Sequence, residues 1–516
     1  MWTGTGKLYT NASGPCHPSA RLPSTPLWDK ILHMRIAITS VRRSSLVLIG
    51  AVAVALACSA SLTAQAPLQQ VSIVITGGIV VTMDAQCKVL WPGAVAIDGQ
   101  KIVAVDTPEN VAKRYRGAQV IQAGGHVVMP GLINTHTHAP MVMYRGLADD
   151  MVLMEWLQKY IFPAEAKTVS PDMVRIGTRL AALEMIESGT TLFTDMYYFE
   201  EEVGRVAKAA GLRGVLGETI IGFPVADAKT PADALARAER FIQEFKGDPL
   251  VVAAVAPHAM YTNDTATLVA SRDLARKYGV PLLTHVAETL DEVNGSNDKY
   301  KMSPVAYLDS IGFWGPATIA AHFVHVSDAD LAIIARRGAG LSHNPESNMK
   351  LASGAAPVSK ALKAGIPVGL GTDGAASNND LDMFEAMRQA AFLAKVTESD
   401  PTAVSARTAL EMATIGGARA LGMADRIGSL EPGKLADVIV VSMQSGRQTP
   451  LYNPISHLVY VTRGDDVRTT IVNGRILMRN RRVLTLNGPA VIADAVALAK
   501  KVKASVERTP QSSAPR

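Results

Sequence analysis

The stretch from Val127 to His138 reads VVMPGLINTHTH, an apolar run that ends in two histidines separated by one residue. In a buried strand, side chains two positions apart point to the same side, so His136 and His138 can both reach one metal ion. The alternative is two polar residues at a strand end, and the pattern alone is too short to exclude it. Polar residues at the ends of later strands decide between the two interpretations.

Seven further apolar runs follow, and helical patterns separate most of them, as in PDMVRIGTRLAALEMIESG at 171–189. This alternation indicates a parallel α/β architecture, and eight units are the number in a (β/α)8 TIM barrel. Catalytic groups of that fold lie at the C-terminal strand ends. The later runs are TTLFTDM (190–196), LRGVLGE (212–218), VVAAVAPH (251–258), PLLTHVAE (281–288), TIAAHFVHV (318–326), AGLSHNPES (339–347) and PVGLGTDGA (367–375).

Strand patterns of period two flank the barrel pattern on both sides. VSIVITGGIVVTM and AVAIDGQKIVAV precede it, and ADVIVVSM and TTIVNGRILM follow it. Two β blocks of like character predict a small β-sandwich domain built from both chain ends. The predicted segments are an upstream extension with a signal peptide (1–66), the N-terminal portion of the sandwich (67–128), the barrel (129–427), the C-terminal portion of the sandwich (428–485) and a C-terminal helix and tail (486–516).

The N-terminal segment carries an export pattern. Arg42 and Arg43 precede the apolar run LVLIGAVAVALA (46–57), and AQA (64–66) is a cleavage pattern of the A-x-A type. The run has the length of a signal-peptide core and is short for a bilayer span, with an uncleaved anchor as the alternative. The signal begins naturally at Met34, so we expect residues 1–33 to be an upstream extension. We expect an exported protein, periplasmic or secreted, without a stable membrane span in its mature form.

Composition argues against several other classes of protein. The 516 residues are 48% hydrophobic and 19% charged with a net charge of +5, and the basic residues are dispersed, so nucleic acid is not an expected partner. Of the three cysteines, only Cys87 follows the predicted cleavage site. A mature chain with one cysteine forms neither an internal disulfide nor a thiolate metal site.

Polar residues recur at the ends of later runs. His285 lies in the fifth run with Glu288 three residues on, and Asp373 lies in the eighth. With His136 and His138 they predict one site of nitrogen and oxygen ligands plus a water, which suits Zn²⁺, with Fe²⁺ or Mn²⁺ as alternatives. Such a metal lowers the pKa of its water towards neutrality, and Glu288 is placed to accept the proton.

Several segments together carry a resemblance to a known family. They are PGLINTHTHAPM, RGLADDMVLMEWL, APHAMYT, HVAET, AHFVHVSD, SHNPESNMKLASG and GLGTDGAASNNDLDM. From about Val71 to Leu484 the chain resembles the amidohydrolase superfamily. Within it, the chain is similar to the branch of S-adenosylhomocysteine/5'-methylthioadenosine deaminases and triazine chlorohydrolases.

The resemblance implies a TIM barrel with a mononuclear metal site. Binuclear members carry a carboxylated lysine late on the fourth strand, whereas VVAAVAPH has no lysine there, which favours one metal. Glu288 is then the proton shuttle, and His322 in the sixth run contacts the attacking hydroxide or the new oxyanion. The implied metal ligands are His136, His138, His285 and Asp373, and the implied catalytic residues are Glu288, His322 and Asp373.

The resemblance extends to the substrate pocket. Glu165, in FPAEAK, matches the glutamate that adenosine-type deaminases use on ribose hydroxyls, and Trp156 and His258 match further pocket positions. The alternative for Glu165 is a solvated carboxylate at a helix start. Where homocysteine-type members carry an arginine that reads the amino-acid carboxylate, this chain has Glu218 and no obvious arginine.

We therefore expect a metal-dependent hydrolytic deaminase of an adenine-like heterocycle that releases ammonia. The first candidate substrate is a 5'-modified adenosine, namely methylthioadenosine, S-adenosylhomocysteine or adenosine. One alternative is an amidohydrolase acting on a free purine, a cytosine-like ring or a triazine, including dechlorination. Another is a non-catalytic exported binding protein. The expected partner is a small heterocyclic molecule, and a homo-oligomer is compatible with the sequence.

Overall fold

The computed structural model describes residues 67–507. The predicted upstream extension and signal peptide, and the last nine residues of the predicted tail, lie outside the described residues. Export therefore stays a prediction.

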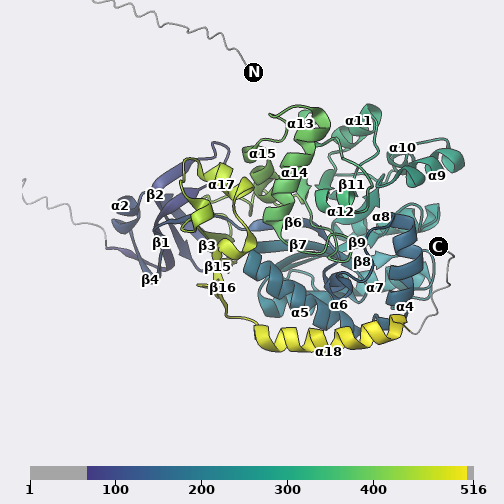
Figure 1. The fold of residues 1–516 in the computed structure, drawn as a ribbon, viewed down its shortest axis with the longest axis horizontal. Coiled ribbons are helices and arrows are strands. Elements are labelled where there is room, and N and C mark those ends of the chain that lie inside the picture. The colour runs from purple at the N-terminus through teal and green to yellow at the C-terminus, as the bar shows by residue number, and fades with distance from the viewer. Residues whose placement is uncertain (1–66, 508–516) are drawn as a thin grey trace, which may run out of the picture. The chain divides into compact units, whose positions relative to one another are not determined.

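Eight parallel strands close into a barrel, in the order β10-β11-β12-β13-β6-β7-β8-β9 (Figure 1). Each of the eight predicted runs supplies one strand, and the prediction of a TIM barrel is confirmed. The strands are β6 (Leu132–Thr137), β7 (Thr190–Tyr197), β8 (Arg213–Ile220), β9 (Val251–Pro257), β10 (Leu282–Val286), β11 (Thr318–His322), β12 (Gly340–His343) and β13 (Val368–Leu370).

Helices follow most of the barrel strands, and capping residues in the sequence mark where these helices begin and end. In α5 (Pro171–Ser188), the Ser170 side chain accepts the amide hydrogen of Met173, and Gly189 ends the helix with a φ of 88°. The other helices of the barrel region are α3 (Leu153–Glu155), α4 (Phe162–Thr168), α6 (Glu200–Ala210), α7 (Pro231–Glu244), α8 (Thr265–Tyr278), α9 (Leu290–Tyr300), α10 (Pro304–Ser310), α11 (Asp328–Arg337), α12 (Pro345–Lys350), α13 (Val358–Lys363), α14 (Met383–Glu398), α15 (Ala406–Glu411) and α16 (Gly417–Ala420).

Both ends of the described chain meet in one nine-stranded sheet, where the purple and yellow segments of Figure 1 lie together. β14 pairs antiparallel with β5, and Val440 lies opposite Val128. The predicted small β domain from both chain ends is therefore confirmed. Its strands are β1 (Gln69–Val81), β2 (Val89–Asp98), β3 (Lys101–Asp106), β4 (Tyr115–Gln122), β5 (His126–Pro130), β14 (Val438–Ser442), β15 (Val467–Val472), β16 (Arg475–Arg479) and β17 (Arg482–Val483), with the short helix α2 (Pro108–Ala112). The helix α17 (Pro454–Tyr460) packs on α14 and α15 of the barrel region.

The run VVMPGLINTHTH divides at Gly131 into two strands of different sheets. β5 ends at Pro130 in the small sheet, and β6 begins at Leu132 in the barrel. A Cβ atom on Gly131 would lie 2.1 Å from Cγ2 of Thr191, so only glycine fits this close approach. One apolar run thus connects the small sheet directly to the first barrel strand.

A buried ion pair joins the barrel to the small sheet. Arg213, at the start of β8, donates to both oxygens of Asp437 at 2.9 and 3.1 Å, and Asp437 also accepts the amide of Asn473 at 2.7 Å. The side chains of Arg213 and Asp437 are only 1% and 5% exposed. Removing one partner would therefore leave an uncompensated charge in the interior.

Arg213→Ala is expected to lower the free energy of unfolding by about 3–5 kcal/mol, because Asp437 loses its buried counter-charge. Arg205→Ala is the control, since Arg205 pairs with Glu244 at the surface, with side chains 52% and 41% exposed. That pair is expected to contribute about 0–1 kcal/mol. Urea unfolding of both variants measures the difference. Equal losses in the two variants would contradict a structural role for the buried pair.

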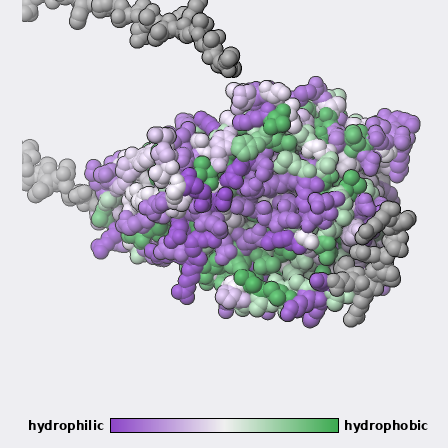
Figure 2. Space-filling view, viewed as in Figure 1, coloured by the Kyte–Doolittle hydropathy of each residue, from purple (hydrophilic) through white to green (hydrophobic). Residues whose placement is uncertain are grey.

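The predicted C-terminal helix is α18 (Gly488–Glu507), which runs along α5 and α4 (Figure 1). Asp494 of α18 accepts a hydrogen bond from Arg179 of α5 at 2.9 Å. Figure 2 shows a largely hydrophilic face, with hydrophobic residues along the edge where α18 exposes Ile492 and Val496. Across residues 67–507, no helix combines the length and the apolar character that crossing a bilayer requires.

Candidate active site

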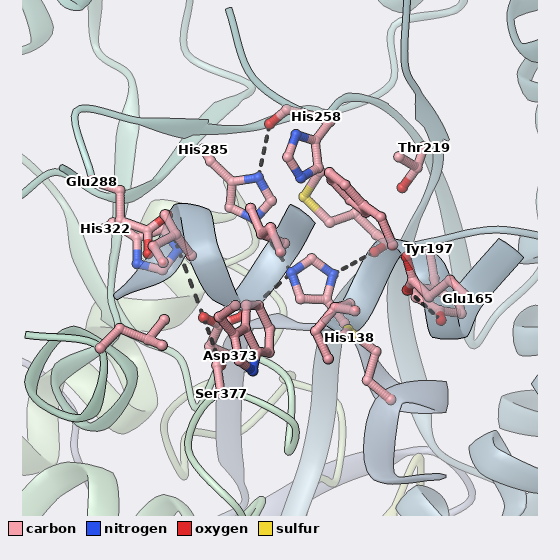
Figure 3. Close-up of a pocket in the computed structure, with 18 of the residues that line it drawn as sticks. His138, Glu165, Tyr197, Thr219, His258, His285, Glu288, His322, Asp373 and Ser377 are labelled. Carbon is pink, nitrogen blue, oxygen red and sulfur yellow. Dashed lines mark hydrogen bonds and ion pairs between the residues drawn. The ribbon is translucent and has the colours of Figure 1, made fainter. Parts of the chain in front are cut away.

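A cavity lies at the C-terminal ends of the barrel strands (Figure 3), with about 610 Å³ of space when the part open to solvent is included. Barrel folds place their reactive groups at this end. Eight of the nine predicted site residues line the cavity: His138, Trp156, Glu165, His258, His285, Glu288, His322 and Asp373. The ninth, His136, is 3% exposed and lies within the same cluster of rings, with its ring centre 4.9 Å from that of His138.

The four predicted metal ligands converge although they come from three separate strand ends. Asp373 Oδ1 lies 3.4 Å from His136 Nε2 and 3.3 Å from His138 Nε2. His285 Nε2 lies 3.3 Å from His138 Nε2. Three nitrogens and one carboxylate oxygen therefore surround a common point, as a first coordination shell requires.

Hydrogen bonds on the opposite ring nitrogens aim these histidines. The Nδ1 atoms of His138 and His285 lie 2.6 and 2.8 Å from the carbonyl oxygens of Met196 and His258. Nδ1–H donation to these carbonyls leaves both Nε2 lone pairs directed into the cluster, the arrangement typical of metal-binding histidines.

His136 Nε2 is buried and has no hydrogen-bond partner among the described residues. Burial lowers the pKa of His136 to about 4, which keeps its imidazole neutral at pH 7. A buried nitrogen lone pair without a partner is costly unless a ligand occupies it. The donor set of this cluster therefore fits one divalent cation.

Three residues of the site have positive φ angles, which are uncommon outside glycine. The φ angles of Ala287, His322 and Asp373 are 52°, 72° and 64°. Each lies at or just after the C-terminal end of a barrel strand. Such backbone strain persists where the surrounding structure fixes it, and it concentrates at functional sites.

Glu288 and His322 lie together on one side of the cluster (Figure 3). His322 Nε2 is 3.7 Å from Glu288 Oε2, and His322 Nδ1 is 2.9 Å from Oδ1 of Asn348. Burial raises the pKa of Glu288 above its ordinary value, which suits a carboxylate that takes up and returns a proton. The contact with Asn348 was not predicted from the sequence.

Glu165 lies on the opposite side of the cavity from Glu288 (Figure 3). Its side chain is buried, so the interpretation as a solvated helix-start carboxylate is wrong. Tyr197 OH donates to Glu165 Oε1 at 2.7 Å, and burial raises the pKa of Glu165 to about 7. No sequence pattern indicated Tyr197, because it follows directly on the predicted run at 190–196, which has the character of an ordinary buried strand.

Trp156 and His258 complete the predicted pocket. Trp156 Nε1 is buried without a hydrogen-bond partner among residues 67–507, and Oγ1 of Thr219, another lining residue, is in the same state. His258 Nδ1 lies 3.1 Å from Thr262 Oγ1, and its ring centre lies 4.7 Å from that of His285. The Trp156 and Thr219 atoms are available to a bound molecule.

None of the described residues that line the cavity is a lysine or an arginine. Glu218 is fully buried outside the lining and accepts a hydrogen bond from Arg237 at 2.9 Å. Arg237 is also bound to Glu201 and lies 3.4 Å from Asp227, so its charge is compensated there. The cavity therefore offers no cationic side chain to a substrate carboxylate.

Comparison with known proteins places the chain in a family. Residues 127–477, which include both the metal-ligand cluster and the cavity, match the amidohydrolase family. The protein belongs to the amidohydrolase family. Among its relatives, the chain is 48% identical over 431 residues to a 5-methylthioadenosine/S-adenosylhomocysteine deaminase of Syntrophobacter fumaroxidans, a match that covers 84% of this chain and 98% of the relative. It is 44% identical over 436 residues to a 5'-deoxyadenosine deaminase of Methanosarcina mazei, covering 84% and 99%.

Solved structures of this amidohydrolase's relatives agree with that placement. An adenosine deaminase from Xanthomonas campestris with bound zinc is 38% identical, with a TM-score of 0.84 over 85% of this chain and 100% of the other. A triazine hydrolase variant is 26% identical, with a TM-score of 0.77 over 83% and 99%. Both branches named by the sequence resemblance are therefore represented among the relatives.

Proposed function

We propose that the protein is a metal-dependent deaminase of 5'-modified adenosines that releases ammonia. The observation that carries this proposal is one cavity with a cluster of metal-binding side chains at one end and the buried carboxylate of Glu165 at the other. Deaminases at 40–48% identity support the reaction.

We propose that one divalent metal, with Zn²⁺ first and Fe²⁺ or Mn²⁺ as alternatives, is held by His136, His138, His285 and Asp373. When bound, such an ion supplies a water molecule of lowered pKa and favours negative charge on the reacting oxygen. Ser347 and Ser377 donate to Asp373 Oδ2 at 2.7 and 3.1 Å, which leaves Oδ1 directed towards the histidines.

Glu288 would take a proton from the attacking water and deliver it to the ring nitrogen beside the amino-bearing carbon. A bond from the water oxygen to that carbon forms. Glu288 would then carry the second water proton to the amino group, so that the carbon–nitrogen bond breaks, ammonia leaves and a 6-oxo ring protonated on that nitrogen remains. His322, whose Nδ1 lies 2.9 Å from Oδ1 of Asn348, would contact the reacting oxygen through Nε2 as negative charge develops there. Dechlorination would not need the leaving group to be protonated, so Glu288 favours deamination.

Glu165 would accept hydrogen bonds from the vicinal ribose hydroxyls. Tyr197 donates to Oε1, which restricts the orientation of the carboxylate in the cavity. Trp156 and His258 would contact the base and the sugar. Because no lysine or arginine lines the cavity in the described chain, an uncharged 5' substituent fits this site better than an amino-acid tail.

Glu165→Ala is expected to lower kcat/KM for a riboside by about tenfold or more, because a charged hydrogen bond to a sugar hydroxyl contributes roughly 1.5–3 kcal/mol. The rate with the free base adenine should be unchanged, since that substrate has no ribose to lose. Lys159→Ala, at an exposed position six residues earlier, is the control. If both substrates lose activity equally, Glu165 supports the cavity generally and the nucleoside assignment fails.

A further inference from the structure

Glu288 lies in a three-residue turn between β10 and α9. Val286 ends β10, Ala287 has a φ of 52°, and Thr289 is the N-cap of α9, where its side chain accepts the amide hydrogen of Glu292 at 3.3 Å. Within the described chain the Glu288 carboxylate has an ion-pair contact with His322 and no hydrogen bond that would fix it. The position of that carboxylate therefore depends on how firmly its backbone is held.

Glu292 holds this backbone in an unusual way. In a capping box, the acidic side chain at the third helical position accepts the amide of the N-cap residue. Two other helices of the barrel follow that rule: Asp233 accepts the amide of Thr230 at 3.0 Å, and Asp330 accepts that of Ser327 at 2.8 Å. Glu292 Oε2 instead accepts the amide of Glu288 at 3.0 Å, one residue before the N-cap.

Helix capping alone does not account for this side chain. Glu292 is 6% exposed, and its Oε1 has no hydrogen-bond partner among the described residues. Burial raises the pKa of Glu292 to about 7, although hydrogen bonds from the amides of Ala287 and Glu288 act in the opposite direction. Burial by itself does not set Glu292 apart, because the ordinary capping carboxylate of Asp330 is also buried; the amide that Glu292 accepts does.

We propose that Glu292 is a positioning residue for Glu288. By accepting the Glu288 amide, it fixes the left-handed turn at Ala287 and so aims the Glu288 carboxylate at the reacting atoms. The inference rests on the proposed role of Glu288 as proton shuttle. Displacement of a reacting group by about 1 Å can cost about a hundredfold in rate, so a hydrogen bond to its backbone can control turnover.

The test compares Glu292→Met, which keeps the length but removes the acceptor, with Glu292→Gln, which keeps one acceptor oxygen. We expect Glu292→Met to lower kcat by about 10- to 100-fold with KM within about threefold and metal content unchanged, and Glu292→Gln to stay within about threefold of wild type. The exposed neighbour Asp291 gives the control Asp291→Asn, with wild-type kinetics. The proposal is overturned if kcat of Glu292→Gln is as low as that of Glu292→Met, or if Glu292→Met changes KM and leaves kcat unchanged.

A double mutant separates positioning from general support. In a Glu288→Gln background, Glu292→Met should lower the residual kcat by less than about twofold, because its route to the reaction is already lost. If Glu292→Met lowers kcat in this background as much as it does in the wild type, the proposal is overturned.

If Glu292→Met does not fold, Glu292→Asp is the replacement variant, because its side chain is shorter by one methylene and withdraws the acceptor. It is expected to show the same loss of kcat, and a wild-type kcat in Glu292→Asp would contradict the proposal. If Glu288→Gln keeps full turnover, the role of Glu288 as proton shuttle fails. If Glu288→Gln loses turnover but Glu292→Met keeps it, only the inference about Glu292 is refuted.

Discussion

Glu288→Gln is expected to keep its metal and its fold while kcat falls by roughly two to four orders of magnitude. The carboxamide is nearly isosteric but cannot take up a proton from the attacking water. Glu288 is proposed as a shuttle and not as a ligand, because its carboxylate belongs to neither group of converging side chains that could hold a metal ion among the described residues. Ammonia release gives kcat, elemental analysis gives the metal content, and circular dichroism verifies the fold.

Two outcomes would contradict the assignment of Glu288. Unchanged turnover would remove it from the mechanism. Loss of metal together with loss of turnover would make it a ligand instead. Asp291→Asn serves as the matched control, because it also replaces a carboxylate by an amide but at an exposed position in the first turn of α9.

His285→Ala is expected to lower metal occupancy and activity together. Wild-type protein should hold close to one equivalent of metal, because the proposed ligand atoms of His136, His138, His285 and Asp373 lie in one cluster. Removing one nitrogen from such a set weakens binding of the ion and leaves the other ligands without their common partner.

His457→Ala is the control for this experiment, since His457 lies on α17, outside the cavity lining, and its Nδ1 lies 3.1 Å from a backbone oxygen. It should keep full occupancy and full activity. Two tightly bound equivalents in the wild type would overturn the assignment of a single metal. Full activity in metal-free protein would remove the metal from the mechanism.

The barrel and the cluster of proposed ligands could be predicted because the order of strands and helices in the sequence determines which residues lie at the same rim of the barrel. In a parallel barrel every strand ends at the same rim, so polar residues at the ends of separate runs meet there. His136, His285 and Asp373 are far apart in the sequence but converge by this rule. No long-range contact had to be known in advance.

Other features depend on packing that no local pattern encodes. The need for glycine at position 131, where one apolar run divides into two strands, follows from its close approach to Thr191 of β7. The bonds from Tyr197 to Glu165 and between His322 and Asn348 likewise join side chains on different elements. Glu292 has an N-terminal helix pattern, but its bond to the amide of Glu288 is visible only in three dimensions.

The most direct test of the proposed function is a substrate series that follows ammonia release by the purified metal-loaded protein. With 5'-deoxyadenosine or methylthioadenosine, we predict one ammonia per nucleoside consumed and the matching 6-oxo nucleoside as product. Adenine and aminotriazines should react much more slowly, because they cannot use Glu165. Turnover of free bases or triazines alone, with no ammonia from the nucleosides, would contradict the account.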